Sequence, residues 1–330
     1  MIKRNIIFTI LGIIGFIFVW GIFLPLSFVP QSNINYVVSK GMGYREIGLA
    51  LEKKGVIANH GFFNAFALMS LHYNNLQAGT YSISSSMSVA SIISKIASGK
   101  TLRNNLTLLE GWDLHDMGSY LEKKDVTTQK DFLTLTKQDV SGQYEFLKDK
   151  PKKQSLEGYL FPDTYEVGKN PDQEELVREM LDNFGSKLTP ALRGEIARQH
   201  KTVFQVVTMA SILEKEVRTL EDKKIVAGIL WKRIDEGVPL QVDATVNYVT
   251  GKSDARVSLK DATIDSPYNT YKYYGLPAGP ICNPGIDSLL AAIYPTKSDY
   301  WYYLSANATG KTIFSKTFAE HSAAIRKYLQ

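Results

Sequence analysis

Apolar residues recur along this chain with several different spacings, and each spacing predicts a different element. An almost unbroken apolar run covers residues 6–29, and about 20 such residues suffice to cross the core of a bilayer. The run is longer than the apolar region of a typical signal peptide, and no small-residue cleavage site follows it. Lys3 and Arg4 precede the run, so the positive-inside rule predicts a cytoplasmic tail at residues 1–5, a single-pass anchor at residues 6–29, and the rest of the chain outside the membrane.

Two segments after the anchor repeat one pattern at an offset of 70 residues. SKGMGYREIGLALEKKGV aligns without gaps with LEGWDLHDMGSYLEKKDV, which places Gly41 on Gly111 and Gly48 on Gly118. Each copy is preceded by a predicted strand, and within it a glycine turn leads to an amphipathic helix. Such strand–helix units resemble LysM-like modules of cell-wall proteins. We therefore expect a LysM-like region at residues 31–103 and a second LysM-like repeat with a linker at residues 104–150; a packed spacer that binds nothing is the alternative.

The rest of the chain, residues 151–330, mixes helical and strand patterns. Apolar positions recur at helical spacing in PDQEELVREMLDNF, in residues 203–218, in EDKKIVAGILWKRIDEG and in FAEHSAAIRKYLQ. The aromatic-rich DYWYYLSA and the following TGKTIFS predict two strands of a hairpin. The charged, proline-containing KDKPKK at residues 148–153 predicts a linker before this region. The predicted fold class is therefore α+β: an N-terminal transmembrane helix, LysM-like strand–helix repeats, then a mixed α+β domain.

Composition excludes several kinds of site. Hydrophobic residues make up 44% of the chain and charged residues 22%, which is typical of a globular protein. The net charge is +5 and the basic runs are short, so we expect no nucleic-acid partner. Cys282 is the only cysteine, and the five histidines show no ligand spacing, so the sequence predicts neither a metal site nor a cofactor.

One carboxylate stands out within residues 203–218, VFQVVTMASILEKEVR. At about 100° per residue, Glu214 falls inside the apolar stripe of this predicted helix, whereas Glu216 points about half a turn away. A carboxyl group against an apolar surface resists ionisation and can serve as a general acid near neutral pH. The alternative is that Glu214 only forms an ion pair with Arg218 one turn later.

Further polar and aromatic candidates lie in three segments. In LQVDATVNY, Asp243 is a plausible helix N-cap and Gln241 is a polar group close to it. In SPYNTY, Tyr268 and Asn269 precede a stiff loop that is rich in glycine and proline. In LEGYLFPDTY, Tyr159 belongs either to the core or to a surface on which sugar rings stack.

These segments together resemble the MltG, or YceG-like, endolytic murein transglycosylase family, and the resemblance runs from the anchor to the C-terminal helix. The blocks that carry it are LEGYLFPDTY, ASILEKE, LQVDATVNY, SPYNTY and GLPAGPICNPG, in that order. One departure is Lys311, where the family often has histidine. The resemblance assigns the catalytic acid/base to Glu214. It implies that residues 151–330 form the catalytic domain, with Gln241, Asp243, Tyr268, Asn269 and Tyr159 as candidate substrate-binding residues.

The implied reaction cleaves the β-1,4 bond between N-acetylmuramic acid and N-acetylglucosamine inside a glycan strand and leaves a 1,6-anhydro end. The nucleophile is the substrate's own C6 hydroxyl, so one carboxyl group serves as acid and then as base, unlike the carboxylate pair of most glycosidases. Family analogy places the enzyme on the outer face of the bacterial cytoplasmic membrane, acting on nascent strands beside penicillin-binding synthases and terminating strand elongation. An ordinary hydrolase and a non-catalytic peptidoglycan-binding scaffold that recruits synthases are the alternatives.

Overall fold

The computed structural model describes residues 2–29, 31–168, 171–252, 257–306 and 309–329. The chain divides into two compact units, the first formed by residues 1–106 and 166–171, the second by residues 107–165 and 172–330. Both contain helices and strands, so the mixed α+β class is confirmed. The division differs from the expected one, because residues 107–150 pack with the second unit rather than with the first repeat.

The predicted anchor segment begins as a helix and ends in an irregular segment. Helix α1 (Ile2–Phe23) contains an apolar span, Asn5–Phe23, with a mean hydropathy of 2.7. The expected anchor continued to residue 29, but the helix stops six residues earlier. There Pro25 forms an isolated bridge with Ser88, and the Ser27 amide donates to the Ser85 carbonyl. The segment after α1 therefore packs along the first unit instead of prolonging the helix.

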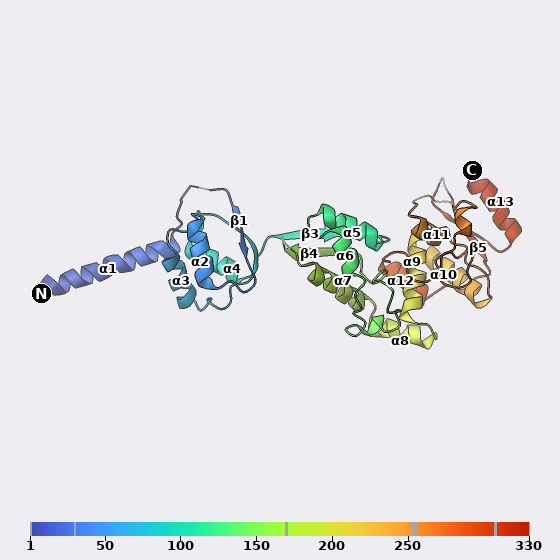
Figure 1. The fold of residues 1–330 in the computed structure, drawn as a ribbon, viewed down its shortest axis with the longest axis horizontal. Helices are drawn as coiled ribbons and strands as arrows, with labels where there is room; N and C mark the ends of the chain where they lie inside the picture. Colours follow the sequence, from blue (N-terminus) through green and yellow to red (C-terminus); the bar gives the residue numbers. More distant parts are fainter. Residues whose placement is uncertain (1, 30, 169–170, 253–256, 307–308, 330) are drawn as a thin grey trace. The chain divides into compact units, whose positions relative to one another are not determined.

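After α1, the core of the first unit is formed by a two-stranded antiparallel sheet and three helices (Figure 1). Tyr36 and Val38 on one strand, and Tyr81 and Ile83 on the other, turn alternate side chains into the core, as the twofold period of a strand requires. Leu51 and the other apolar helix residues close this core. The elements are β1 (Ile34–Val38), α2 (Tyr44–Lys53), α3 (His60–Met69), β2 (Gly79–Ile83) and α4 (Val89–Ala97).

Both copies of the sequence repeat form a strand, a glycine turn and a helix, as predicted. The second copy comprises β3 (Arg103–Thr107), α5 (Leu114–Lys123) and α6 (Gln129–Leu135), and β3 pairs with β4 (Thr164–Gly168). Gly41 and Gly111 adopt φ values of 86° and 80°, in the left-handed region that favours glycine. A methyl group on Gly48 or on Gly118 would approach a phenylalanine of the following helix to 3.1 or 3.2 Å. The aligned glycines thus have the same two roles in both copies: the first permits the left-handed turn, and the second allows the following helix to pack closely.

Helices dominate the second unit. The segment KDKPKK was expected to be a linker, but it belongs to this unit. The Lys150 side chain is buried there, and its ammonium group donates to the carbonyls of Pro151 and Gln154. The remaining helices are η1 (Glu145–Leu147), α7 (Gln173–Lys187), α8 (Pro190–Arg198), α9 (Val203–Glu216), α10 (Leu220–Asp235), α11 (Asp243–Thr250), η2 (Asp261–Thr263), α12 (Ile286–Ile293) and α13 (Phe318–Tyr328).

Helix α9 is the central helix of this unit. Its first turn is closed by a capping box, in which the Thr202 hydroxyl accepts from the Gln205 amide and the Gln205 side chain accepts from the Thr202 amide. Nine of its fourteen residues are buried, because α8, α10, α11 and α12 all pack against it (Figure 1). A helix buried on most sides has no single face that marks the functional surface.

The predicted C-terminal hairpin and helix are confirmed. Strands β5 (Tyr302–Ser305) and β6 (Thr312–Ser315) pair antiparallel, with Tyr303 opposite Phe314. Helix α13 packs against both strands. The Tyr302 ring stacks on His321 of this helix, with 5.1 Å between the ring centroids.

Candidate active site

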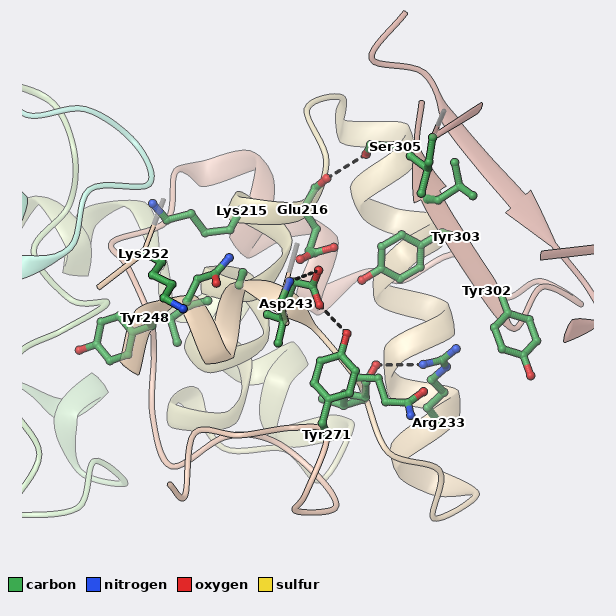
Figure 2. Close-up of a pocket in the computed structure, with 18 of the residues that line it drawn as sticks. Lys215, Glu216, Arg233, Asp243, Tyr248, Lys252, Tyr271, Tyr302, Tyr303 and Ser305 are labelled. Atoms are coloured by element: carbon green, nitrogen blue, oxygen red, sulfur yellow. Dashed lines mark hydrogen bonds between the residues drawn. The ribbon is translucent and has the colours of Figure 1, made fainter. Parts of the chain in front are cut away.

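A cavity of 1140 Å³ opens beside the C-terminal end of α9 (Figure 2). This volume exceeds the range of about 300–1,000 Å³ that is usual for small-molecule sites. Its walls come from the end of α9, from α11 and the residues before it, from β5 and from α13. Among the described residues, the acids that line it are Asp113, Asp116, Glu216 and Asp243.

Glu216 is half-buried in the wall of this cavity. It is the last residue of α9, and Val217 continues in extended conformation, with φ −143° and ψ 154°. Burial raises the pKa of the Glu216 carboxyl to about 7, helped by the negative charge of Asp243, although hydrogen bonds from the Tyr303 hydroxyl and the Ala244 amide oppose the shift. Near neutral pH this carboxyl can therefore both give up and take back a proton.

Asp243 and Gln241 also line the cavity. Asp243 was expected to be a helix N-cap, but the cap is Val242 and Asp243 is the first residue of α11. Its carboxylate is thus not used for capping; it accepts a hydrogen bond from the Tyr271 hydroxyl and one from the Val257 amide at 3.3 Å (Figure 2). Gln241 is exposed and adopts a φ of 54°, so its side chain is available to a ligand.

Glu214, the residue that the sequence indicated, lies in a different environment. Its Oε1 accepts from the Lys223 ammonium at 3.1 Å, and Oε2 accepts from the Gly285 amide at 3.0 Å and the Ser288 hydroxyl at 2.6 Å. The Glu214 and Lys223 side chains are only 9% and 5% exposed. The expected partner of the ion-pair alternative was Arg218, but the ion pair is made with Lys223, and Glu214 is not among the residues that line the cavity.

A second buried network holds the wall next to α11. Glu157 accepts hydrogen bonds from the Leu114 amide at 3.1 Å, the Asn283 amide group at 3.0 Å and the Tyr248 hydroxyl at 3.3 Å. Burial raises the pKa of the Glu157 carboxyl to about 8. The Asn283 side-chain oxygen accepts from the amides of Gly158 and Leu160, both at 3.0 Å. These bonds fix Tyr248, which lines the cavity, to the start of α5.

The other three candidate binding residues lie outside the cavity lining. Tyr159 is fully buried and packs against Phe146 and Phe184, which is the core arrangement and not the sugar-stacking one. Asn269 is 1% exposed, and its side-chain amide donates to the carbonyls of Ala262 and Ile264, so it stabilises a turn. Tyr268 packs against the Tyr248 ring at a centroid distance of 5.1 Å and thereby supports the cavity wall from behind.

Comparison with known proteins identifies the family. The model of the YceG-like family matches residues 36–327, which is most of the chain. The chain belongs to the YceG-like family. Two proteins named endolytic murein transglycosylase are similar to it. That of Bacillus subtilis is 34% identical, with 96% of this chain and 91% of the relative aligned. That of Streptococcus pneumoniae serotype 2 is 30% identical, with 96% of this chain aligned, and this chain spans 62% of its length.

A solved structure extends this similarity to the fold. The crystal structure of a yceG-like protein from Listeria monocytogenes superposes with a TM-score of 0.60 at 34% sequence identity. The alignment covers 89% of the present chain and 99% of that chain. The YceG-like assignment made from the sequence blocks is therefore confirmed by sequence and by structure.

Sequence reasoning missed two features of this YceG-like site. Glu216 points away from the apolar stripe and so is not indicated by it, yet the cavity reaches the last two residues of this buried helix, Lys215 and Glu216. The sequence patterns also do not indicate Tyr271 and Tyr303, although their hydroxyls donate to the carboxyl groups of Asp243 and Glu216. The tyrosine-rich composition of both segments was the available signal. Within the described ranges, no three histidine, cysteine or acidic side chains gather as metal ligands would.

Proposed function

We propose that this chain is a membrane-anchored endolytic lytic transglycosylase of peptidoglycan. It cleaves the N-acetylmuramic acid-β-1,4-N-acetylglucosamine bond within nascent glycan strands and leaves 1,6-anhydro ends, which terminates strand elongation. The family and the names of the similar proteins support the substrate class. The observation that carries the chemistry is Glu216, a carboxyl group in a large cavity with a pKa of about 7.

In the proposed mechanism Glu216, and not Glu214, is the acid and then the base. The protonated Glu216 gives its proton to the glycosidic oxygen as the bond from that oxygen to muramyl C1 breaks. The C6 hydroxyl oxygen of the same sugar then bonds to C1, and its proton returns to Glu216. No water is consumed, and the enzyme regains its starting protonation state. A single carboxyl with a pKa near neutral suits both steps.

The charged and polar groups beside Glu216 have supporting roles in this proposal. The Asp243 carboxylate keeps the pKa of Glu216 high and supplies negative charge for the oxocarbenium-like transition state. The exposed Gln241 side chain binds sugar hydroxyl or N-acetyl groups. Glu214 holds the junction of α9, α10 and the start of α12, and so acts on the cavity only through the position of the α9 terminus.

The same proposal covers the placement of the protein in the cell. The apolar helix α1 anchors the chain in the cytoplasmic membrane with its N-terminus inside. Both units then lie on the outer side, where nascent peptidoglycan strands and the penicillin-binding synthases that make them are within reach.

Mass spectrometry of the products is the experiment that tests this function. The full-length protein in detergent micelles is incubated with purified uncrosslinked peptidoglycan strands, and the new chain ends are identified. We expect 1,6-anhydromuramyl ends, each lighter by one water than a reducing end. Reducing muramyl ends would instead indicate a hydrolase. Strands that are bound but keep their length would indicate a non-catalytic scaffold, and either result would overturn the proposal.

A further inference from the structure

The two sides of the cavity differ in their charged groups. Figure 2 shows Lys215, Lys252 and Tyr248 on one side of Glu216 and Asp243, with Arg233 and Tyr302 on the other. Asp113 and Asp116, at the start of α5, also line the cavity. They belong to the first side, because the Leu114 amide and the Tyr248 hydroxyl both donate to one oxygen of Glu157 and so hold the start of α5 next to Tyr248. This side is therefore the more charged one, next to the proposed acid.

Only one lysine or arginine of the described cavity lining has no partner. Lys252 forms an ion pair with Asp261 at 2.8 Å, and the buried Arg233 guanidinium donates to the carbonyls of Leu240 and Trp301. Lys215 is exposed and makes no ion pair or hydrogen bond with any described residue. Its ammonium group is thus free to bind an anion.

The sugar backbone of the proposed substrate has no anionic group that would bind the Lys215 ammonium. Its hydroxyl and N-acetyl groups are neutral, and Gln241 or Asp243 can bind them. The muramyl sugar, however, carries a lactyl group to which a peptide with free carboxylates is attached. The bond that breaks is at C1 of this same sugar, so its substituent must lie near Glu216, and Lys215 lines the same cavity as Glu216 (Figure 2).

We propose that Lys215 forms a subsite for a carboxylate of the peptide carried by the muramyl sugar at the reacting bond. This inference rests on the proposed function. It makes the enzyme selective for peptide-bearing strands over strands from which peptides have been removed. An exposed ion pair contributes at most about 1 kcal/mol, so the selectivity due to Lys215 is up to about fivefold, and it decreases at high salt because the charges are screened.

The test compares two substrates. One is a preparation of uncrosslinked strands with intact peptides, and the other is the same preparation after an amidase has removed the peptides and left a free lactyl carboxylate. Lys215→Gln should lower the ratio of kcat/KM on peptide-bearing strands to kcat/KM on peptide-free strands by up to about fivefold, and Lys215→Arg should restore it. Lys252→Gln is the matched control, because Lys252 already has Asp261 as a partner, and it should leave the ratio unchanged.

The outcomes separate the two proposals. An unchanged ratio for Lys215→Gln would overturn the peptide subsite, provided that wild-type protein still produces anhydro ends. A larger loss on peptide-free strands would place the lactyl carboxylate on Lys215 and would likewise overturn it. If wild-type protein produces no anhydro ends from either substrate, the proposed function fails first.

Discussion

Two carboxyl groups two residues apart on α9 have opposite surroundings. Glu214 lies in a closed junction where an ammonium group, a backbone amide and a hydroxyl satisfy both of its oxygens. Glu216 lies in the wall of a cavity of 1140 Å³ with its pKa raised to about 7. A buried charge whose two oxygens are both paired serves the fold, whereas a carboxyl that lines a cavity and has a pKa near neutral can exchange protons with a ligand.

Neutralising each carboxyl group in turn tests which of the two is needed for activity. Glu216→Gln should lower the rate of anhydro-end formation by roughly 10²–10⁴-fold, the usual contribution of a general acid, while the protein stays folded. Glu214→Gln should retain much more activity when it is assayed well below its unfolding temperature. The measurement is the initial rate of anhydromuramyl products by mass spectrometry, with circular dichroism as the folding control. The reverse order of activities would return the catalytic role to Glu214.

The helix that carries the two glutamates could be predicted from the sequence, but their different surroundings could not. Helix α9, predicted over residues 203–218 and observed over Val203–Glu216, follows from the spacing of apolar residues, and so do α10 and α13. The hairpin of β5 and β6 follows from the aromatic-rich composition of its first strand. Which glutamate lines the cavity does not follow, because the apolar stripe of a central helix contacts other helices. Two partners of Glu214 are 71 and 74 residues away in sequence, and no local pattern indicates such contacts.

Tyr159 and Asn269 show that a resemblance to a family has a similar limit. Both belong to sequence blocks that carry the family resemblance, and both proved to stabilise the fold around the site. Gln241 and Asp243, from another of these blocks, do line the cavity. A resemblance of blocks identifies the family, but it does not separate residues that touch the substrate from residues that hold the chain in place.

The second prediction concerns the contribution of the Glu214–Lys223 ion pair to stability. Glu214→Gln should lower the free energy of unfolding by about 3 kcal/mol, because it leaves the buried Lys223 ammonium without its carboxylate. Denaturant unfolding followed by tryptophan fluorescence measures this in the second unit, which contains Trp112, Trp231 and Trp301.

The control is the double variant Glu214→Gln with Lys223→Met, which removes both charges and should recover part of the loss. If Glu214→Gln unfolds at the same denaturant concentration as wild type, the junction does not depend on this ion pair.

The smallest expected effect is a shift in pH dependence, and it tests what Asp243 does to Glu216. Because the proposed first step needs protonated Glu216, kcat/KM should be level below pH 7 and fall about tenfold per pH unit above it. Asp243→Asn removes the negative charge that disfavours ionised Glu216, so the pKa of Glu216 should decrease and the falling limb should move to lower pH. Burial remains the larger cause, so the pKa should stay above its ordinary value.

Glu214→Gln should leave the limb in place, since Glu214 is not among the groups that shift the pKa of Glu216. A limb that moves with Glu214→Gln but not with Asp243→Asn would mean that the titrating acid lies in the closed junction and not in the cavity.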